Sequence, residues 1–161
     1  MNDNKDFDDL IKDIIINEKF GKLNGELHHG INRYIHSMNV AKKTYKVTKK
    51  LKLDYKSATR AALLHDFYSN DDLDTTSGIR ALYQHPSKAL DNTTKYFNIN
   101  AKEANIIESH MFPIGRKFPK YKESYLVSII DKIVGTYEIF KYKRLVPFTT
   151  SLLLVINFFK K

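Results

Sequence analysis

Residues 54–67 read DYKSATRAALLHDF, and this stretch decides the fold class. Asp54 belongs to the residue types that favour the N-cap position of a helix. The small and apolar positions behind it follow the spacing of a buried helical face: Ala58, Ala61, Ala62, Leu63 and Leu64. The stretch therefore predicts a largely buried helix that ends at the adjacent pair His65 and Asp66.

Stretches on both sides of this helix show the same apolar periodicity. We expect further helices at about 6–18, 32–51, 86–97, 100–110 and 121–142. Asn100 with Glu103 three positions later is typical of an N-terminal capping signal, and Pro86 suits the first turn of a helix. The segments 69–78 and 111–119 are polar or proline-containing and predict loops. No alternating stretch bounded by hairpin turns competes, so we expect an all-α chain forming one compact domain over residues 1–161.

The composition excludes several kinds of site. The chain has 161 residues, of which 42% are hydrophobic and 28% charged, values near the globular average. It contains no cysteine, which excludes disulfides, thiolate zinc sites, iron–sulfur clusters and a cysteine nucleophile. A transition metal here must be held by imidazole and oxygen ligands, and only 6 histidines are present to supply the imidazoles.

The formal net charge is +9, from 27 basic and 18 acidic residues. A phosphate-carrying partner explains such a surplus, and so does a general richness in lysine. The lysines are spread along the chain instead of forming one basic stripe with interleaved aromatic residues, so we do not expect a dedicated nucleic-acid module. A nucleic-acid-binding helical protein is left as an alternative motivated by the charge alone.

Both ends of the chain bear on its location. The first 13 residues, MNDNKDFDDLIKD, are acidic and amphipathic and do not resemble a secretory signal, so we expect a cytoplasmic protein. The apolar run 145–159 spans about 22 Å as a helix, less than the roughly 30 Å of a bilayer core. We expect a terminal helix at about 147–159 that packs on the domain or on a partner chain, which leaves a homodimer open. Weak contact of this helix with a membrane surface is a further alternative.

Histidines and aspartates occur at chemically suggestive positions. His36 lies one turn into a helix, His65 and Asp66 are adjacent, and His85 precedes a proline. His110 closes a helix, and Asp131 lies within the apolar run SIIDKIVG. Each histidine alone is compatible with an ordinary hydrogen-bonded core residue. A carboxylate in an apolar helix, however, is costly to bury unless it meets a cation or a hydrogen-bond network.

The ordered spacing of these residues resembles that of a known superfamily. The histidine in RYIHSMNVA precedes the doublet in RAALLHDF by 29 positions, and the aspartate in SIIDKIVGTYE follows the doublet by 65. This order, with two further histidines between doublet and last aspartate, resembles the HD-domain metal-dependent phosphohydrolases over about residues 30–138. The small stand-alone bacterial type, which includes hydrolases of symmetrical dinucleoside polyphosphates, is the most similar. The Gly-Tyr-Pro element of the HD-GYP branch is absent, so the resemblance does not extend to cyclic dinucleotides.

The resemblance implies a compact helical bundle of the HD-domain type that binds two divalent ions, which could be Fe, Mn, Zn, Ni, Co or Mg. It implies that one ion is held by His36, His65, Asp66 and Asp131, and the second by Asp66, His85 and His110. The reaction it implies is hydrolysis of a nucleotide or another small phosphate ester or anhydride by a metal-bound hydroxide.

Two basic side chains are predicted to bind the substrate and, together with Asp66, to take part in catalysis. Arg33 precedes His36 by one helical turn and so lies on the same side of its helix, and Lys132 follows the last ligand. Asp71 and Asp72 are candidates for assisting proton transfer. The segments 69–83 and 111–120 are expected to set the substrate. The alternative is a non-catalytic HD-type module that binds a nucleotide or a partner chain and keeps a structural metal.

Overall fold

The computed structural model describes residues 3–28, 31–73 and 78–143, and the chain is all-α there. The helices are α1 (Asp3–Ile15), α2 (Glu18–Gly21), α3 (Arg33–Lys50), α4 (Tyr55–Leu64), α5 (Gly78–Tyr96), α6 (Ala101–Ser109) and α7 (Lys122–Lys143), with 3₁₀ turns η1 (Lys22–Gly25) and η2 (Asn70–Asp72). Two-residue strands β1 (Leu27–His28) and β2 (Ile31–Asn32) pair antiparallel just before α3.

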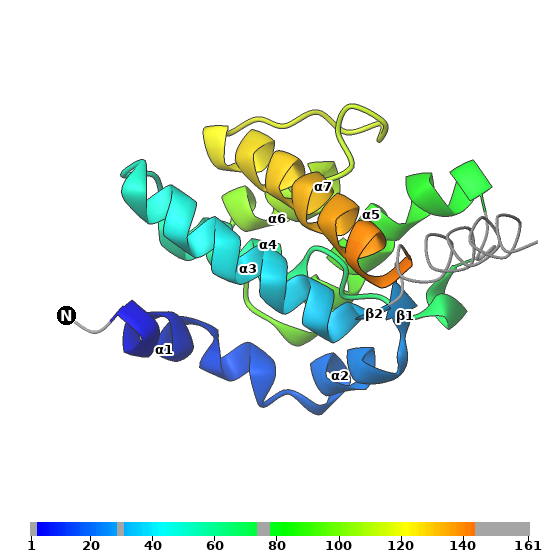
Figure 1. Ribbon diagram of the computed structural model, residues 1–161, viewed down its shortest axis with the longest axis horizontal. Coiled ribbons are helices and arrows are strands. Elements are labelled where there is room, and N and C mark those ends of the chain that lie inside the picture. The colour runs from blue at the N-terminus through cyan, green and yellow to red at the C-terminus, as the bar shows by residue number, and fades with distance from the viewer. Residues whose placement is uncertain (1–2, 29–30, 74–77, 144–161) are drawn as a thin grey trace, which may run out of the picture.

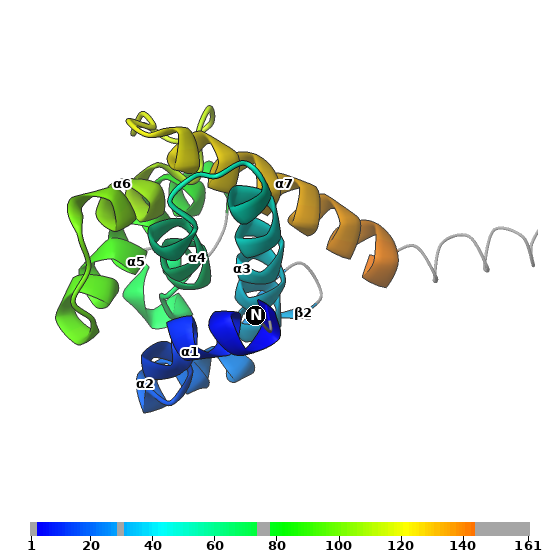
Figure 2. The same ribbon diagram turned by 90° about the vertical axis from the view of Figure 1, so that its left-hand side faces the viewer.

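The helices α3 and α4 pack against each other at the centre of the bundle (Figures 1 and 2). Helix α7 lies across α3 and α6, and α5 packs on α6. Helices α1 and α2 lie on the side of the bundle opposite α7, where α1 contacts α4 (Figure 2). This arrangement brings helices that are distant in the sequence around the end of α4, where the His65–Asp66 doublet lies.

The core is built from the apolar faces that the periodicity predicts. Phe7, Ile11 and Ile14 bury one face of α1, and Ile106 and Ile107 do the same for α6. The residues of α4 from Ala61 to Leu64 are fully buried. Because alanine side chains are small, neighbouring helices can approach α4 closely, which is what allows side chains from several helices to meet at its end.

The expected N-caps are present. The Asp54 side chain accepts from the Ser57 amide at 3.1 Å. Asn100 accepts from the Glu103 amide at 2.9 Å, while the Glu103 carboxylate accepts from the Asn100 amide at 2.8 Å, a complete capping box. Arg60 adds a bridge between α1 and α4 through two contacts of 2.6 and 2.8 Å to Asp13.

The start of α5 differs from the prediction. The helix begins at Gly78, and Pro86 lies inside it instead of in its first turn. A proline in a helix interior removes one backbone hydrogen bond and strains the preceding turn. Here the ring N–H of His85 donates to the Ala81 carbonyl at 3.1 Å, and the His85 ring packs on the Tyr68 ring with centroids 5.3 Å apart, contacts that hold the turn before the proline.

The expected C-terminal helix at about 147–159 lies outside the described residues. None of the helices in the described ranges combines the length and the apolar character needed to cross a bilayer. The segment 111–120 contains turns and bends but no helix or strand, as the sequence predicts.

Replacing Asn100 with alanine removes the cap of α6 and its hydrogen bond to Ser57. We expect the free energy of unfolding to fall by about 1 kcal/mol, the usual cost of losing a side-chain cap. Denaturant titration of Asn100→Ala measures the loss. Asn98→Ala, at an exposed position just before the cap, is the matched control, and an equal effect of both changes would contradict the capping role.

Candidate metal centre

All six residues predicted as metal ligands lie in one cluster. The cluster forms around the end of α4, where the neighbouring helices α3, α5, α6 and α7 each contribute a side chain. His65 is the C-cap residue of α4, and His110 is the C-cap residue of α6. The contributing residues are His36 from α3, His65 and Asp66 at the end of α4, His85 from α5, His110 at the end of α6, and Asp131 from α7.

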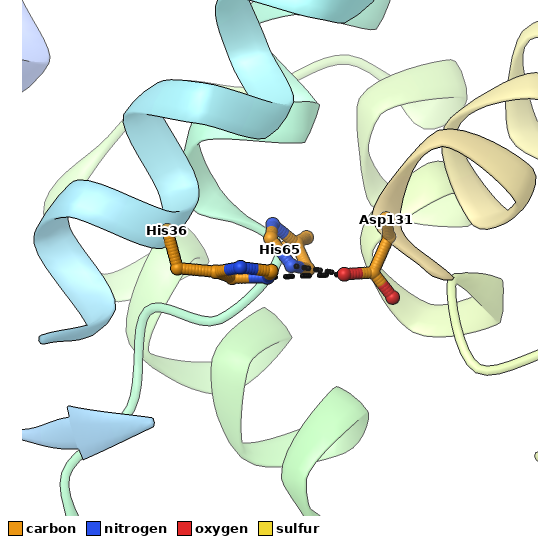
Figure 3. Close-up of side chains that lie close together, drawn as sticks. All are labelled: His36, His65 and Asp131. Atoms are coloured by element: carbon orange, nitrogen blue, oxygen red, sulfur yellow. Dashed lines mark hydrogen bonds and ion pairs between the residues drawn. The ribbon is translucent and has the colours of Figure 1, made fainter. Parts of the chain in front are cut away.

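One half of the cluster gathers around the carboxylate of Asp131. Its Oδ1 atom lies 3.0 Å from His36 Nε2 and 3.4 Å from His65 Nε2 (Figure 3). Both imidazoles are fully buried, whereas 14% of the Asp131 side chain is exposed. These three residues offer ligand atoms close enough together to hold one metal ion.

The other half gathers around the carboxylate of Asp66. Its Oδ1 atom lies 3.6 Å from His85 Nε2 and 3.6 Å from His110 Nε2, and those two nitrogens are 2.9 Å apart. Its Oδ2 atom is 3.7 Å from His65 Nε2. Because a single imidazole nitrogen binds one ion, His65 can serve one half only. Asp66, with an oxygen directed to each half, is the residue that can join them.

Backbone carbonyls fix the orientation of three of the imidazoles. His65 Nδ1 donates to the Ala62 carbonyl and His110 Nδ1 donates to the Ile107 carbonyl, each at 2.8 Å. His85 Nδ1 donates to the Ala81 carbonyl. The last carbonyls of a helix lack partners within the helix, so a histidine at the C-cap finds an acceptor there. In the neutral ring each Nε2 then carries a lone pair that points into the cluster.

The arrangement of these lone pairs fits a bound cation. Burial lowers the pKa of His85, and burial followed by the nearby His65 and His85 rings lowers the pKa of His110 to about 3, so both rings are neutral at neutral pH. Two neutral Nε2 atoms at 2.9 Å, each with its proton on Nδ1, repel each other unless a cation lies against both. His65 Nε2 is also buried and forms no hydrogen bond within the described ranges.

The separations around Asp131 agree with metal coordination, whereas those from Asp66 to the imidazoles are slightly longer. An ion with nitrogen and oxygen ligands at about 2.1 Å places neighbouring ligand atoms about 3.0–3.4 Å apart. The contacts around Asp131 are 3.0 and 3.4 Å, and those around Asp66 range from 2.9 to 3.7 Å. The donor set is imidazole and carboxylate, which suits first-row divalent ions. Buried histidine and aspartate side chains are therefore placed where they could hold a metal ion.

Glu138 is a residue of the site that the sequence argument missed. Its buried carboxylate accepts from His36 Nδ1 at 2.6 Å and from the Asn39 side-chain amide at 2.8 Å. A carboxylate behind a ligand imidazole fixes the ring orientation and raises its basicity. The available signal was its position two helical turns after Asp131 on α7, which places both carboxylates on the same side of the helix.

The charges around His36 are tightly balanced. Burial lowers the pKa of His36, but the hydrogen bonds with Asp131 and Glu138 outweigh it and raise that pKa to about 10. Burial raises the pKa of Asp131, and its contacts with His36 and His65 reverse this and hold it well below the usual value. In the metal-free chain a proton on His36 therefore takes the place that a metal cation would have next to Asp131.

Arg33, predicted to bind substrate, already has protein partners. The buried guanidinium donates from Nη1 to Glu26 at 3.2 Å and to the Tyr68 carbonyl at 3.1 Å, and from Nη2 to Asn70 at 2.9 Å. It also lies over the Tyr68 ring at 3.9 Å. Through Tyr68 and Asn70, Arg33 orders the segment that follows the His65–Asp66 doublet. The Tyr68 ring in turn packs on the His85 ring. Phosphate binding by Arg33 stays a prediction.

The Lys132 side chain contacts the backbone of His110, one residue of the cluster. Its Nζ donates to the His110 carbonyl at 2.9 Å and to both the carbonyl and the hydroxyl of Ser128. Burial lowers the pKa of Lys132. One of these hydrogen bonds ties α7 to the end of α6, and the two to Ser128 are formed within α7. This is a positioning role, and substrate binding by Lys132 also stays a prediction.

Of the two loop acids, Asp72 has a structural role. Its carboxylate accepts from the Ser69 amide at 2.7 Å and from the Asn92 side chain at 2.9 Å, closing the turn η2 and tying it to α5. Asp71 is exposed in the same turn.

Comparison of the chain with protein-family models, with curated proteins and with solved structures found no match in any of the three. The resemblance to the HD-domain superfamily therefore stays a prediction, and the site is defined by its geometry.

Changing Glu138 to glutamine keeps the shape of the side chain but removes the charge behind His36. We expect metal affinity to fall about 10–100-fold, the usual effect of losing the partner of a ligand imidazole. Titration of the metal-free protein with Mn²⁺ or Zn²⁺, followed by calorimetry, measures the affinity. Glu18→Gln, at an exposed position of α2, is the control. Unchanged affinity in Glu138→Gln would remove Glu138 from the site.

Chelation tests the cation requirement directly. Removing a bound divalent ion leaves the lone pairs of His85 and His110 opposed, so we expect chelator to lower the thermal midpoint of the metal-loaded chain and re-addition of metal to restore it. The double variant Asp66→Asn with Asp131→Asn, which lacks both carboxylates, should not respond to chelator. A midpoint that is the same with and without metal in the unaltered chain contradicts the site.

Proposed function

We propose that this chain is a metal-dependent phosphohydrolase that acts on a nucleotide or another small phosphate ester or anhydride. The observation that carries the proposal is the convergence of His36, His65, Asp66, His85, His110 and Asp131, six residues spread over 95 positions, on one buried cluster. A structural site for a single ion needs four ligands. Six ligands divided by a carboxylate with two directed oxygens suit two ions.

The proposed reaction needs both the metal ions and the residues that position them. Two divalent ions activate a water molecule and neutralise charge on a phosphoryl group when they are bound. The six residues would hold these ions, with Asp66 joining the two halves, and Glu138 and the Ala62 and Ile107 carbonyls fix the imidazoles. Lys132 keeps the end of α6 against α7, so that His110 and Asp131 stay in register. Asp131, the most exposed ligand, marks the side from which substrate reaches the cluster.

A basic pocket on α5, which none of the six cluster residues lines, is a candidate site for the phosphorylated substrate. This pocket of about 320 Å³ lies between α5 and the segment 111–120, and Gln84 and Pro86, which flank His85, belong to its lining. Three cations line it: Arg80, Arg116 and Lys117. The Arg116 guanidinium lies 5.1 Å from the Tyr83 ring centroid, and Lys117 pairs with Glu108 at 2.8 Å. Arg80, Tyr83, Arg116 and Lys117 lie in the segments 69–83 and 111–120, which the sequence predicts to set the substrate.

Two observations favour the second candidate, a non-catalytic module with a structural metal. Arg33 and Lys132 donate their hydrogen bonds to protein acceptors, and five of the six ligands are almost completely buried. A chain of this kind loses stability with its metal but releases no phosphate.

Elemental analysis combined with a hydrolysis panel tests the proposal. We expect up to two divalent ions per chain and turnover of at least one compound in a panel of nucleotides, dinucleoside polyphosphates and simple phosphate esters. Asp66→Ala and Asp131→Ala should reduce turnover to the background rate while the helical circular-dichroism signal is retained. Asp91→Asn, an exposed aspartate on α5, is the control and should keep full activity.

The outcomes separate the two candidates. Metal bound at these residues without turnover of any compound supports the structural-metal module. Absence of bound metal in protein purified and reconstituted with Fe, Mn, Zn, Ni, Co or Mg contradicts both.

A further inference from the structure

The outer side of α7 carries a continuous line of large apolar side chains. Tyr125, Ile129, Ile133, Tyr137 and Phe140 are 45%, 54%, 57%, 64% and 58% exposed, respectively. Their spacing of three or four residues places them one above another on the same side of the helix. The line from Tyr125 to Phe140 is about 22 Å long. We call these five residues the α7 stripe.

The α7 stripe is unlike ordinary surface composition. Single exposed apolar residues are common, but a contiguous apolar patch on a protein marks an interaction surface. Between Tyr125 and Phe140 the well-exposed positions of α7 carry no charge, although 28% of the chain is charged. The opposite side of the same helix holds Asp131 and Glu138 against His36. The stripe therefore lies on the outside of the helix that supports the metal centre.

The part of the chain after the described residues has a matching apolar face. Residues 148–159 read FTTSLLLVINFF. Phe148, Leu152, Val155 and Phe159 follow one another by three or four positions, which is the spacing of one helical side. Thr150 and Asn157 fall on the opposite side of such a helix. Twelve helical residues extend about 18 Å, close to the length of the α7 stripe.

The connection between the two segments favours a reversal of direction. Helix α7 ends at Lys143, and residues 144–147 read RLVP. Proline disfavours the helical conformation of the residue before it and fits the first turn of a new helix. Antiparallel helices are commonly joined by two to five residues. Four residues are therefore sufficient for the chain to turn back along α7.

We propose that residues 148–159 form a helix that packs antiparallel on the α7 stripe and covers it. In the register set by the short connection, Phe148 lies beside Phe140, Val155 beside Ile133, and Phe159 beside Ile129. This inference does not depend on the proposed function.

Covalent connection favours this occupant over a second copy of the chain. A segment tethered by four residues is present at an effective concentration in the millimolar range, well above the concentration of a second chain in solution. It also buries two apolar surfaces at once, the α7 stripe and the face of the terminal segment, each of which otherwise stays in water.

The absence of cysteine from the sequence allows a clean test in the full chain. The proposed register places Ile133→Cys and Val155→Cys within disulfide distance. We expect mild oxidation to join this pair within one chain, detected as increased mobility in non-reducing electrophoresis and as a cross-linked peptide by mass spectrometry. The control pair, Ile133→Cys with Asn157→Cys, has the same tether but places the second cysteine on the opposite side of the helix, and should form several-fold less bridge.

Other results overturn the proposal in distinguishable ways. Bridges between chains, with a dimer mass by light scattering, assign the stripe to a second copy. Sedimentation of the unaltered chain with phosphatidylserine vesicles, without an intrachain bridge in the variant, assigns it to a membrane surface. Equal bridging of both pairs shows that no fixed contact exists. Hydrogen exchange of the unaltered chain avoids the substitutions: we expect protected amides in residues 148–159, and exchange at the rate of an unstructured peptide contradicts the proposal.

Discussion

Asp131 sets the strictest constraint on this fold, because its carboxylate lies in a helix that packs against the bundle and meets His36 at 3.0 Å and His65 at 3.4 Å. Burying a carboxylate or an imidazolium without partners costs more than a single domain can offset. Each charge in the cluster must therefore be matched by another, and the match exists only when α3, α4 and α7 pack in one arrangement. The alanine-rich α4 permits that approach, and the C-terminal carbonyls of α4 and α6 hold the imidazoles in place.

Polar side chains around the cluster hold the candidate ligands in position. Glu138 supports His36, Lys132 ties His110 to α7, and Arg33 secures the segment after the doublet. All three lie close in the sequence to His36 or Asp131, and all three direct their hydrogen bonds to protein atoms. A positive residue next to a ligand can thus be required for the geometry of a site whether or not it contacts the substrate.

Sequence reasoning succeeded where the signal was periodic or local. The all-α class and the caps at Asp54 and Asn100 follow from spacing and local residue type. The grouping of the six histidine and aspartate residues was implied only by the resemblance to the HD-domain superfamily, and the structure shows these side chains in one cluster. Sequence reasoning failed where tertiary contacts decide. Pro86 is a common helix-start residue, but the Tyr68 ring and the His85 side chain hold the turn before it, so that α5 starts eight residues earlier. The role of Glu138 depends on a histidine 102 positions away, which no local pattern encodes.

The wide separation of the ligands along the chain has a consequence for biosynthesis. The two carboxylates that contact His36, those of Asp131 and Glu138, lie 95 and 102 residues later, on the last helix of the described chain. Chains emerge from the ribosome N-terminus first at roughly 5–20 residues per second. His36, His65 and Asp66 are therefore exposed to cellular cations for several seconds before Asp131 emerges. On the proposed function, the centre is completed only when α7 closes over α3, and loading with the correct metal is a late step in the maturation of the protein.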